Sequence, residues 1–327
     1  MILESKWFFG EKYTVDGNPA MKLKQLPVFE IDGDERELQE SFLELLIFEL
    51  VRLNLLCTVV YPDDLQGQQS LYTLIREYDV VFVAGKTDLP LQKITLFPVI
   101  NEKTGGGLEC VVGDGDSFAA FLKLFLERLR EMHSRMPVWG CILIGGKSSR
   151  MGLPKHLIKD DSGKTWLECT IDILKPLVDG IIISGAGDVP ESLSGMMRVE
   201  DIPGVAGPLS GVVAATRRLP QVSWLLVACD MPHISKEAVD WLLGGRCPGC
   251  WGVVPRMEET GYFEPLFAWY DMRAGQLFER QLQEEVLRIG RLATHRKIAN
   301  PIIPQSLRDG WKNVNTPEQL QQVKRME

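Results

Sequence analysis

No stretch of the sequence approaches the eighteen or so consecutive apolar residues that cross a lipid bilayer, so no membrane-spanning helix is expected. The first residues lack a basic segment followed by an apolar one, so we expect no secretory signal. Only four histidines are present, and no Ser/His/Asp catalytic set is evident among them. The seven cysteines are an odd number and mostly lie in apolar contexts, which is typical of reduced core thiols. These absences predict a cytoplasmic protein without a nucleophilic triad.

One cysteine pair has the spacing of a redox or metal motif. Cys247 and Cys250 flank a Pro-Gly dipeptide, but a second Cys-x-x-Cys and a nearby histidine are both missing. The pattern therefore favours a turn flanked by thiols, and a functional pair is the alternative.

The negative charge is concentrated in the first part of the chain. Residues 1–136 contain 14 basic and 22 acidic side chains, whereas the whole chain has a net charge of −8, so the remainder is neutral. An acidic N-terminal half argues against binding to nucleic acid or to an anionic membrane surface.

The pattern of apolar segments predicts two α/β domains. Both halves of the 327 residues alternate apolar strands with helical patterns, which is typical of parallel sheets covered by helices. In the second half the pattern predicts strands over residues 138–144, 180–184, 223–229, 251–255 and 264–270, and it predicts helices that include one over residues 208–218. A polar stretch between Glu131 and Pro137 follows a long amphipathic helix and precedes an apolar strand. We therefore expect domains over residues 1–136 and 137–327, each Rossmann-like and three-layered.

A glycine pair follows the first strand of the second half. The apolar run Val138–Ile144 ends at Gly145 and Gly146, and Lys147, Arg150 and Lys155 follow within eleven residues. Glycines allow close approach of the backbone to a ligand, and loop N–H groups with nearby cations suit anionic oxygens. The spacing fits neither a Walker A loop nor a dinucleotide-binding loop. It predicts a triphosphate site, and a glycine-rich turn with solvated cations is the alternative.

Three further segments of this half carry residues that could bind a metal or a nucleotide. Asp230 ends a very apolar strand and can ligate a divalent cation, and Asp201 also follows a strand. Gly207 opens a helix, and Asn313 and Asn315 face one way if that segment is extended. Each could instead be a turn or a helix cap. Taken together on one sheet edge, they indicate nucleotidyl transfer, which needs a metal and cations but no side-chain nucleophile.

At this point several ordered motifs resemble one family, from about Val138 to Met326. They read Leu-Ile-Gly-Gly-Lys-Ser-Ser-Arg-Met-Gly-x-x-Lys, Glu-Asp, Gly-Pro-Leu-Ser-Gly, Cys-Asp-Met-Pro and Asn-Val-Asn-Thr-Pro-Glu. In this order they are similar to the molybdenum cofactor guanylyltransferases (MobA family). The resemblance implies a nucleotide-diphospho-sugar-transferase-like fold, with a mostly parallel sheet and helices on both faces. It also implies transfer of GMP from GTP to molybdopterin, with Mg²⁺ and release of pyrophosphate.

The resemblance also implies roles for single residues. Arg150, Lys155 and Asp230 are expected to be catalytic, and Asp230 to bind the metal. Asn313 and Asn315 are expected near the acceptor or the metal. Ile144 and Ser184 stand where alanine and asparagine are frequent in the family. The nucleotide is expected to contact Leu143, Ile144, Gly145, Gly146, Lys155, Ser184, Asp201, Gly207 and Asp230.

The first half resembles a companion family at one segment. Residues 79–98 are similar to a strand–loop–strand of the GTP-binding adaptor MobB. In that family a Walker A loop follows the first strand, but here acidic residues follow Gly33, and the phosphate-binding lysine is missing. The resemblance implies an adaptor-like domain that has lost nucleotide binding, and it points to molybdoenzymes or molybdenum-insertion proteins as partners.

Two alternatives to guanylyl transfer stay open. One keeps the fold and changes the substrate, to CTP with molybdopterin or to a sugar phosphate. The other is a noncatalytic binding or carrier protein, in which both halves are degenerate.

Overall fold

The computed structural model describes residues 23–33, 35–97, 108–145, 154–258 and 260–324. The chain divides into two compact units. Among the described residues, one unit comprises residues 23–136 and 247–249, and the other comprises residues 137–246 and 250–324. Each unit has a hydrophobic core of its own. Among the described helices, none is long and apolar enough to cross a membrane.

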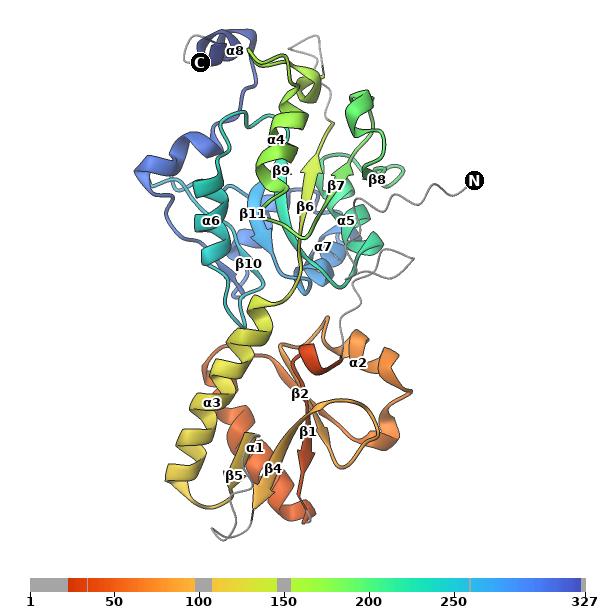
Figure 1. The fold of residues 1–327 in the computed structure, drawn as a ribbon, viewed down its shortest axis with the longest axis vertical. Helices are drawn as coiled ribbons and strands as arrows, with labels where there is room; N and C mark the ends of the chain where they lie inside the picture. Colours follow the sequence, from red (N-terminus) through yellow and green to blue (C-terminus); the bar gives the residue numbers. More distant parts are fainter. Residues whose placement is uncertain (1–22, 34, 98–107, 146–153, 259, 325–327) are drawn as a thin grey trace. The chain divides into compact units, whose positions relative to one another are not determined.

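The N-terminal unit is a five-stranded parallel sheet with the strand order β2-β3-β1-β4-β5 (Figure 1). Its strands are β1 (Val28–Asp32), β2 (Cys57–Val60), β3 (Val80–Ala84), β4 (Gln92–Phe97) and β5 (Leu108–Val111). Its helices are η1 (Leu23–Gln25), α1 (Arg36–Arg52), η2 (Pro62–Asp64), α2 (Gln68–Leu74) and α3 (Gly115–Ser134).

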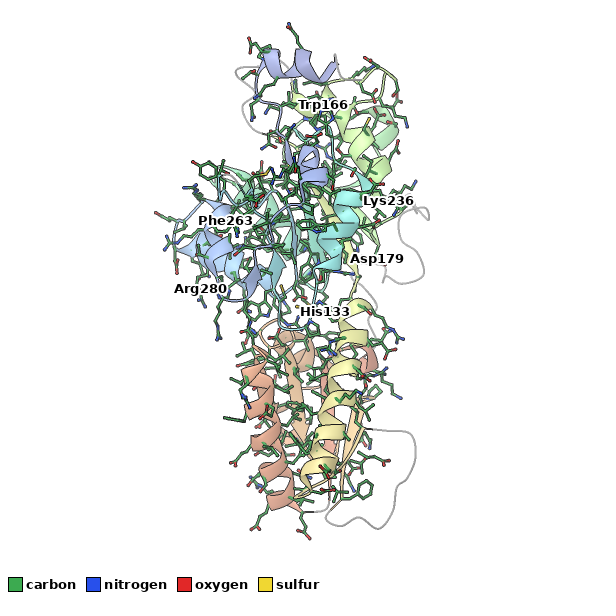
Figure 2. The ribbon with its side chains drawn as sticks, turned by 90° about the vertical axis from the view of Figure 1, so that its left-hand side faces the viewer. His133, Trp166, Asp179, Lys236, Phe263 and Arg280 are labelled. Atoms are coloured by element: carbon green, nitrogen blue, oxygen red, sulfur yellow. The ribbon has the colours of Figure 1, made fainter. Side chains whose placement is uncertain are left out.

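Aromatic side chains form the core of this unit. Helices α1 and α3 lie side by side over the sheet (Figure 2), and Phe42 of α1 packs edge-on against Phe121 of α3. Phe125 of α3 reaches Phe29 of β1, with a distance of 4.8 Å between the ring centroids. Burial of these large side chains is the main favourable contribution to the stability of the unit.

The C-terminal unit is a seven-stranded sheet with the order β12-β10-β11-β9-β6-β7-β8. Its strands are β6 (Val138–Leu143), β7 (Gly180–Ser184), β8 (Met197–Val199), β9 (Ser223–Ala228), β10 (Gly252–Val253), β11 (Phe267–Tyr270) and β12 (Ile298–Ala299). Its helices are η3 (Lys155–Leu157), α4 (Trp166–Leu174), η4 (Glu191–Leu193), α5 (Pro208–Arg218), α6 (Lys236–Gly244), α7 (Ala274–Gln283), η5 (Ile289–Thr294), η6 (Gln305–Trp311) and α8 (Pro317–Lys324).

Strands β8, β7, β6 and β9 run parallel, and β11 is antiparallel to its neighbours β9 and β10. All six residues of β9 are buried, as expected for a strand covered on both faces. Helices α4 and α6 contribute to one core cluster, whereas α5 packs with α7 outside it. The predicted α/β class with a mostly parallel sheet is confirmed.

Most predicted elements of this sheet are present with small shifts of their ends. The strand expected over residues 264–270 pairs only as β11, and the strand expected over 251–255 pairs only as β10. Pro265 has no N–H group, so it cannot donate a ladder hydrogen bond, which is consistent with the later start of β11.

Candidate active site

A pocket of about 340 Å³ opens at the carboxyl ends of β6, β7 and β9. In open α/β sheets this edge is where ligands bind, since loops diverge there between neighbouring strands. The described residues that line it are Leu143, Ile144, Gly145, Lys155, Ser184, Asp201, Gly207, Pro208, Gly211, Ala228, Cys229, Asp230, Leu266 and Asn313.

Backbone hydrogen bonds hold the strand ends around this pocket. The N–H of Ile144 donates to the carbonyl of Ser184 at 2.8 Å, and the N–H of Cys229 donates to the carbonyl of Leu143 at 3.2 Å. Gly185, just beyond β7, has φ +118°, and a Cβ there would stand 1.8 Å from the carbonyl oxygen of Ile144. A residue larger than glycine at position 185 would therefore push the ends of β6 and β7 apart.

Lys155 and Asp230 meet inside the pocket. The Nζ of Lys155 is 2.9 Å from Oδ2 of Asp230 and 2.6 Å from Oδ1 of Asn315. The side chains of Lys155 and Asp230 are 15% and 21% exposed. The carbonyl of Asp230 also accepts a hydrogen bond from the N–H of Val314 at 2.9 Å, which ties the C-terminal segment to the end of β9. A paired, partly exposed charge of each sign thus lies within reach of a ligand.

Ser184 places a buried hydroxyl on the wall of the pocket. The residue is 1% exposed, and its Oγ has no hydrogen-bond partner among the described residues. Gly211 lies in the first turn of α5, directly beside this hydroxyl. Only a glycine leaves room for it there, because a Cβ on residue 211 would stand 2.4 Å from the Oγ of Ser184. The same Cβ would stand 3.3 Å from Oδ1 of Asp201. Buried polar atoms are nearly always paired, so this hydroxyl is available to a ligand in the pocket.

Cys229 is unsuited to be a nucleophile. Burial, and then the negative charge of Asp230, raise the pKa of its thiol to about 12. A thiol in that state carries almost no thiolate near neutral pH, and the thiolate is the reactive form.

The structure brings together most residues that the sequence analysis proposed. Nine of them line the pocket: Leu143, Ile144, Gly145, Lys155, Ser184, Asp201, Gly207, Asp230 and Asn313. Asn315 contacts Lys155 instead. The side chain of Ile144 is 3% exposed and packs into the core, which accommodates its bulk relative to alanine. Gly146, Lys147 and Arg150 lie outside the described residues.

Six residues of this region were not predicted as site residues: Pro208, Gly211, Ala228, Cys229, Leu266 and His156. Leu266 precedes β11 and accepts a hydrogen bond from the N–H of Ala228 at 2.9 Å. His156 is 4% exposed, and its Nε2 lies 2.8 Å from the carbonyl oxygen of Asp188. This bond anchors the turn that carries Lys155 to the loop after β7. Its position next to Lys155 is the one signal in the sequence that could have indicated His156.

Cys247 and Cys250, the two cysteines with the spacing of a metal or redox motif, are not arranged as a metal site. Cys247 is exposed, whereas Cys250 is buried and directs its Sγ to the carbonyl of Gly252 at 3.1 Å. Over the described ranges, no group of three or more His, Cys, Asp or Glu side chains is arranged to hold a metal ion.

This donor set is compatible with magnesium. Mg²⁺ is usually bound by one or two carboxylates together with substrate phosphates, rather than by a cage of protein ligands. Asp230 offers one carboxylate at the pocket, and the amide oxygens of Asn313 and Asn315 lie on the neighbouring segment. The residues present therefore fit a metal that arrives with a nucleotide.

Comparison with known proteins agrees with this arrangement. Residues 140–297 match the family described as MobA-like NTP transferase domain. A "probable molybdenum cofactor guanylyltransferase" of Bacillus cereus is 30% identical over 199 residues, which cover 58% of this chain and 98% of that protein. A protein of the same description from Bacillus mycoides is 28% identical over 194 residues, covering 57% of this chain and 95% of that protein.

A solved structure is also similar to the C-terminal part. It is the molybdopterin-guanine dinucleotide biosynthesis protein A of Archaeoglobus fulgidus, with 22% identity and a TM-score of 0.47, covering 57% of this chain and 97% of that one.

The fold and the pocket define a nucleotidyltransferase of the α/β class. The chain belongs to the family of the molybdenum cofactor guanylyltransferases, through its C-terminal part. The resemblance proposed from the ordered motifs is confirmed for that part.

Proposed function

We propose that this protein transfers GMP from GTP to molybdopterin and releases pyrophosphate. The observation that carries the proposal is the meeting of Lys155 and Asp230 in a pocket at the carboxyl edge of the sheet. A guanylyltransferase needs a carboxylate for a metal and a cation for phosphate oxygens at one place, and these two side chains supply them.

In the reaction an acceptor oxygen attacks the α-phosphorus of GTP. A new P–O bond forms, and the bond to the bridging oxygen of pyrophosphate breaks. Lys155 stabilises the negative charge on the phosphate oxygens, and backbone groups from Leu143 to Gly145 hold the nucleotide against the end of β6. Ser184 and Asp201 offer polar atoms to its other groups, and Asn313 and Asn315 lie on the acceptor side. Arg150 is proposed to contact the phosphates as well.

Asp230 is proposed as the protein ligand of Mg²⁺. When bound, this ion neutralises phosphate oxygens and orients the leaving group. The carboxylate is paired with Lys155, and a metal–nucleotide complex would replace this ion pair by one contact to each of the two side chains. The pair keeps both side chains in place at partial burial, where an unpaired charge would be unfavourable.

The test is an Asp230→Asn variant assayed for pyrophosphate release with GTP, Mg²⁺ and molybdopterin. We expect turnover to fall by roughly 10²- to 10³-fold or more, because the neutral amide no longer attracts the metal. Asp240→Asn is the matched control, since Asp240 lies on α6 and pairs with Lys236 at the surface. Unchanged turnover in Asp230→Asn would remove this residue from the metal site.

The choice of nucleotide is tested by thermal stabilisation. A ligand that binds the folded state raises the melting temperature, by an amount that follows its affinity. We expect GTP with Mg²⁺ to give the largest increase among the four nucleoside triphosphates. A larger increase with CTP or UTP would favour transfer of another nucleotide. GTP binding without pyrophosphate release from any acceptor would favour a carrier protein.

For the N-terminal unit we propose an adaptor role without nucleotide binding. In this unit β1 ends at Asp32 and α1 begins at Arg36, which leaves a short connection where a P-loop would wrap phosphates. The side-chain amide of Gln39 donates to the carbonyl of Gly33 at 2.7 Å, and Lys86 lies 3.6 Å from Asp32. The proposed partners are molybdoenzymes or molybdenum-insertion proteins, and the proposed location is the cytoplasm.

A further inference from the structure

Helix α1 of the N-terminal unit has a second apolar face, which the unit does not bury. One face carries Phe42, Leu43, Leu46 and Leu50 into the core. On another face Leu45, Phe48 and Val51 are 47%, 61% and 57% exposed. Residues three apart along a helix are neighbours on its surface, so these side chains form one continuous stripe. We call residues 45, 48 and 51 the α1 stripe.

Three large apolar side chains exposed side by side are unfavourable in water and are typical of an interaction surface. Arg52 covers the stripe only in part, since its guanidinium carbon lies 5.8 Å from the centre of the Phe48 ring. The exposed fraction of Phe48 is the highest among the large apolar residues of this unit that the structure describes. The stripe therefore has area to bury against a partner.

The charges beside the stripe indicate which partner fits. Glu44 lies four residues before Phe48, and Arg52 lies four residues after it, both at the exposed surface of α1. Arg52 also forms an ion pair with Glu49 of its own helix at 3.1 Å, and its side chain is 65% exposed, so it can still meet a second carboxylate. If two copies of α1 pack antiparallel about Phe48, Glu44 of one copy lies level with Arg52 of the other. Leu45 then lies level with Val51 of the second copy. The stripe is thus complementary to itself under a two-fold axis, which is the commonest symmetry of oligomers.

We propose that a second copy of this chain docks on the α1 stripe, with the two helices antiparallel. A parallel arrangement would place Glu44 beside Glu44 of the other copy, and Arg52 beside its counterpart, which like-charge repulsion disfavours. Helix α1 has 17 residues and is about 25 Å long. A contact between two helices of this length is at the lower end of specific interfaces, so the dimer is expected to be weak and concentration-dependent.

The experiment is sedimentation velocity of the full chain over a wide range of concentrations. We expect the wild-type chain to shift from monomer to dimer as its concentration rises. Phe48→Glu should raise the dissociation constant by about 30-fold or more, because it removes the central buried ring and places two carboxylates together. The helix itself should persist, since glutamate is a good helix former at an exposed position.

Tyr262→Glu is the matched control. Tyr262 is 69% exposed and lies in the C-terminal unit, so the same aromatic-to-glutamate change occurs away from α1. It should leave the dissociation constant unchanged. Circular dichroism of each variant verifies that the fold is retained.

A charge exchange tests the antiparallel register. Glu44→Arg and Arg52→Glu should each weaken the dimer by roughly three- to tenfold, and the double variant should restore most of the affinity. A wild-type chain that stays monomeric at all concentrations overturns the proposal, as does a dimer unaffected by Phe48→Glu. Failure of the double variant to recover overturns the antiparallel pairing. None of these readouts depends on guanylyl transfer, so this inference and the proposed function can fail separately.

Discussion

Glu264 lies just before β11, and burial raises the pKa of its carboxyl group from 4.5 to about 7. Its backbone N–H donates to the carbonyl of Pro255 at 2.8 Å, which fixes this short segment beside the sheet. A carboxyl group whose pKa is higher in the folded chain binds its proton more tightly there than in the unfolded chain. The contribution of Glu264 to stability is therefore greatest below about pH 4.5 and falls as the pH rises to about 7.

Glu264→Gln should remove this loss. At pH 8 we expect the variant to be more stable than the wild type by about 1 kcal/mol once solvent screening is considered, a rise of about 2–4 °C in melting temperature. Near pH 4.5 the two should differ little, because the wild-type carboxyl is then protonated in the folded state. Melting curves between pH 4.5 and 8 measure the difference. An exposed control, Glu191→Gln, should show no such trend, and equal melting temperatures at pH 8 would contradict the assignment.

Among the secondary-structure elements, α5 is the one whose packing shapes the pocket most directly. It begins after Gly207, which has φ +86°, with Pro208 in the first turn, where a missing N–H is harmless. Gly211 then lets this turn approach β7 so closely that a Cβ would overlap the hydroxyl of Ser184.

Gly211→Ala should therefore destabilise the C-terminal unit by about 1–3 kcal/mol through overpacking, despite the better helix propensity of alanine. The double variant with Ser184→Ala should recover most of this loss, since it removes the overlapping oxygen. Thermal unfolding of the four proteins of this double-mutant cycle gives the coupling. Gly275→Ala is the control, because its Cβ would meet only Thr216, at 3.8 Å. Additive effects of the two changes would show that the hydroxyl is not the obstacle.

The elements that the sequence predicted are the long ones. Apolar runs and helical periodicity identified β6, β7, β9 and α5 with ends within one residue of those observed. The pairing of β10 and β12 could not be predicted, since each has two residues and shows no alternation. The antiparallel direction of β11 could not be predicted either, because a fully buried strand is a run of apolar residues whether it is parallel or antiparallel to its neighbour.

Only those residues of the candidate site that belong to short sequence motifs could be predicted. Glycines, Asp230 and Lys155 stand at recognisable positions after strands. The contact between Lys155 and Asn315 joins residues 160 positions apart, and no local pattern encodes such a distance. His156 and Leu266 have ordinary surroundings in the sequence, and their roles arise from the tertiary packing.

At the scale of the whole molecule, the chain combines two units, and the family match lies in only one of them. The C-terminal unit contains the pocket and matches the nucleotidyltransferase family, whereas the match covers none of residues 1–136. The units have about 120 and about 190 residues, the usual size of domains that fold independently. Each has its own aromatic and aliphatic core.

Residues 137–327 expressed alone should therefore keep nucleotide binding and pyrophosphate release, within about threefold of the full chain. With GTP and Mg²⁺ at about 100 times the dissociation constant, this fragment should gain about 2.7 kcal/mol of stability. Residues 20–136 alone should show no change with any nucleoside triphosphate, because the sequence between β1 and α1 lacks the phosphate-binding lysine and is acidic. Differential scanning calorimetry of both fragments and of the full chain measures these gains.

The Asp230→Asn form of the longer fragment serves as its control. Stabilisation of residues 20–136 by GTP would contradict the proposal that the N-terminal unit does not bind nucleotides. A C-terminal fragment that is folded but inactive would show that the N-terminal unit is needed for catalysis.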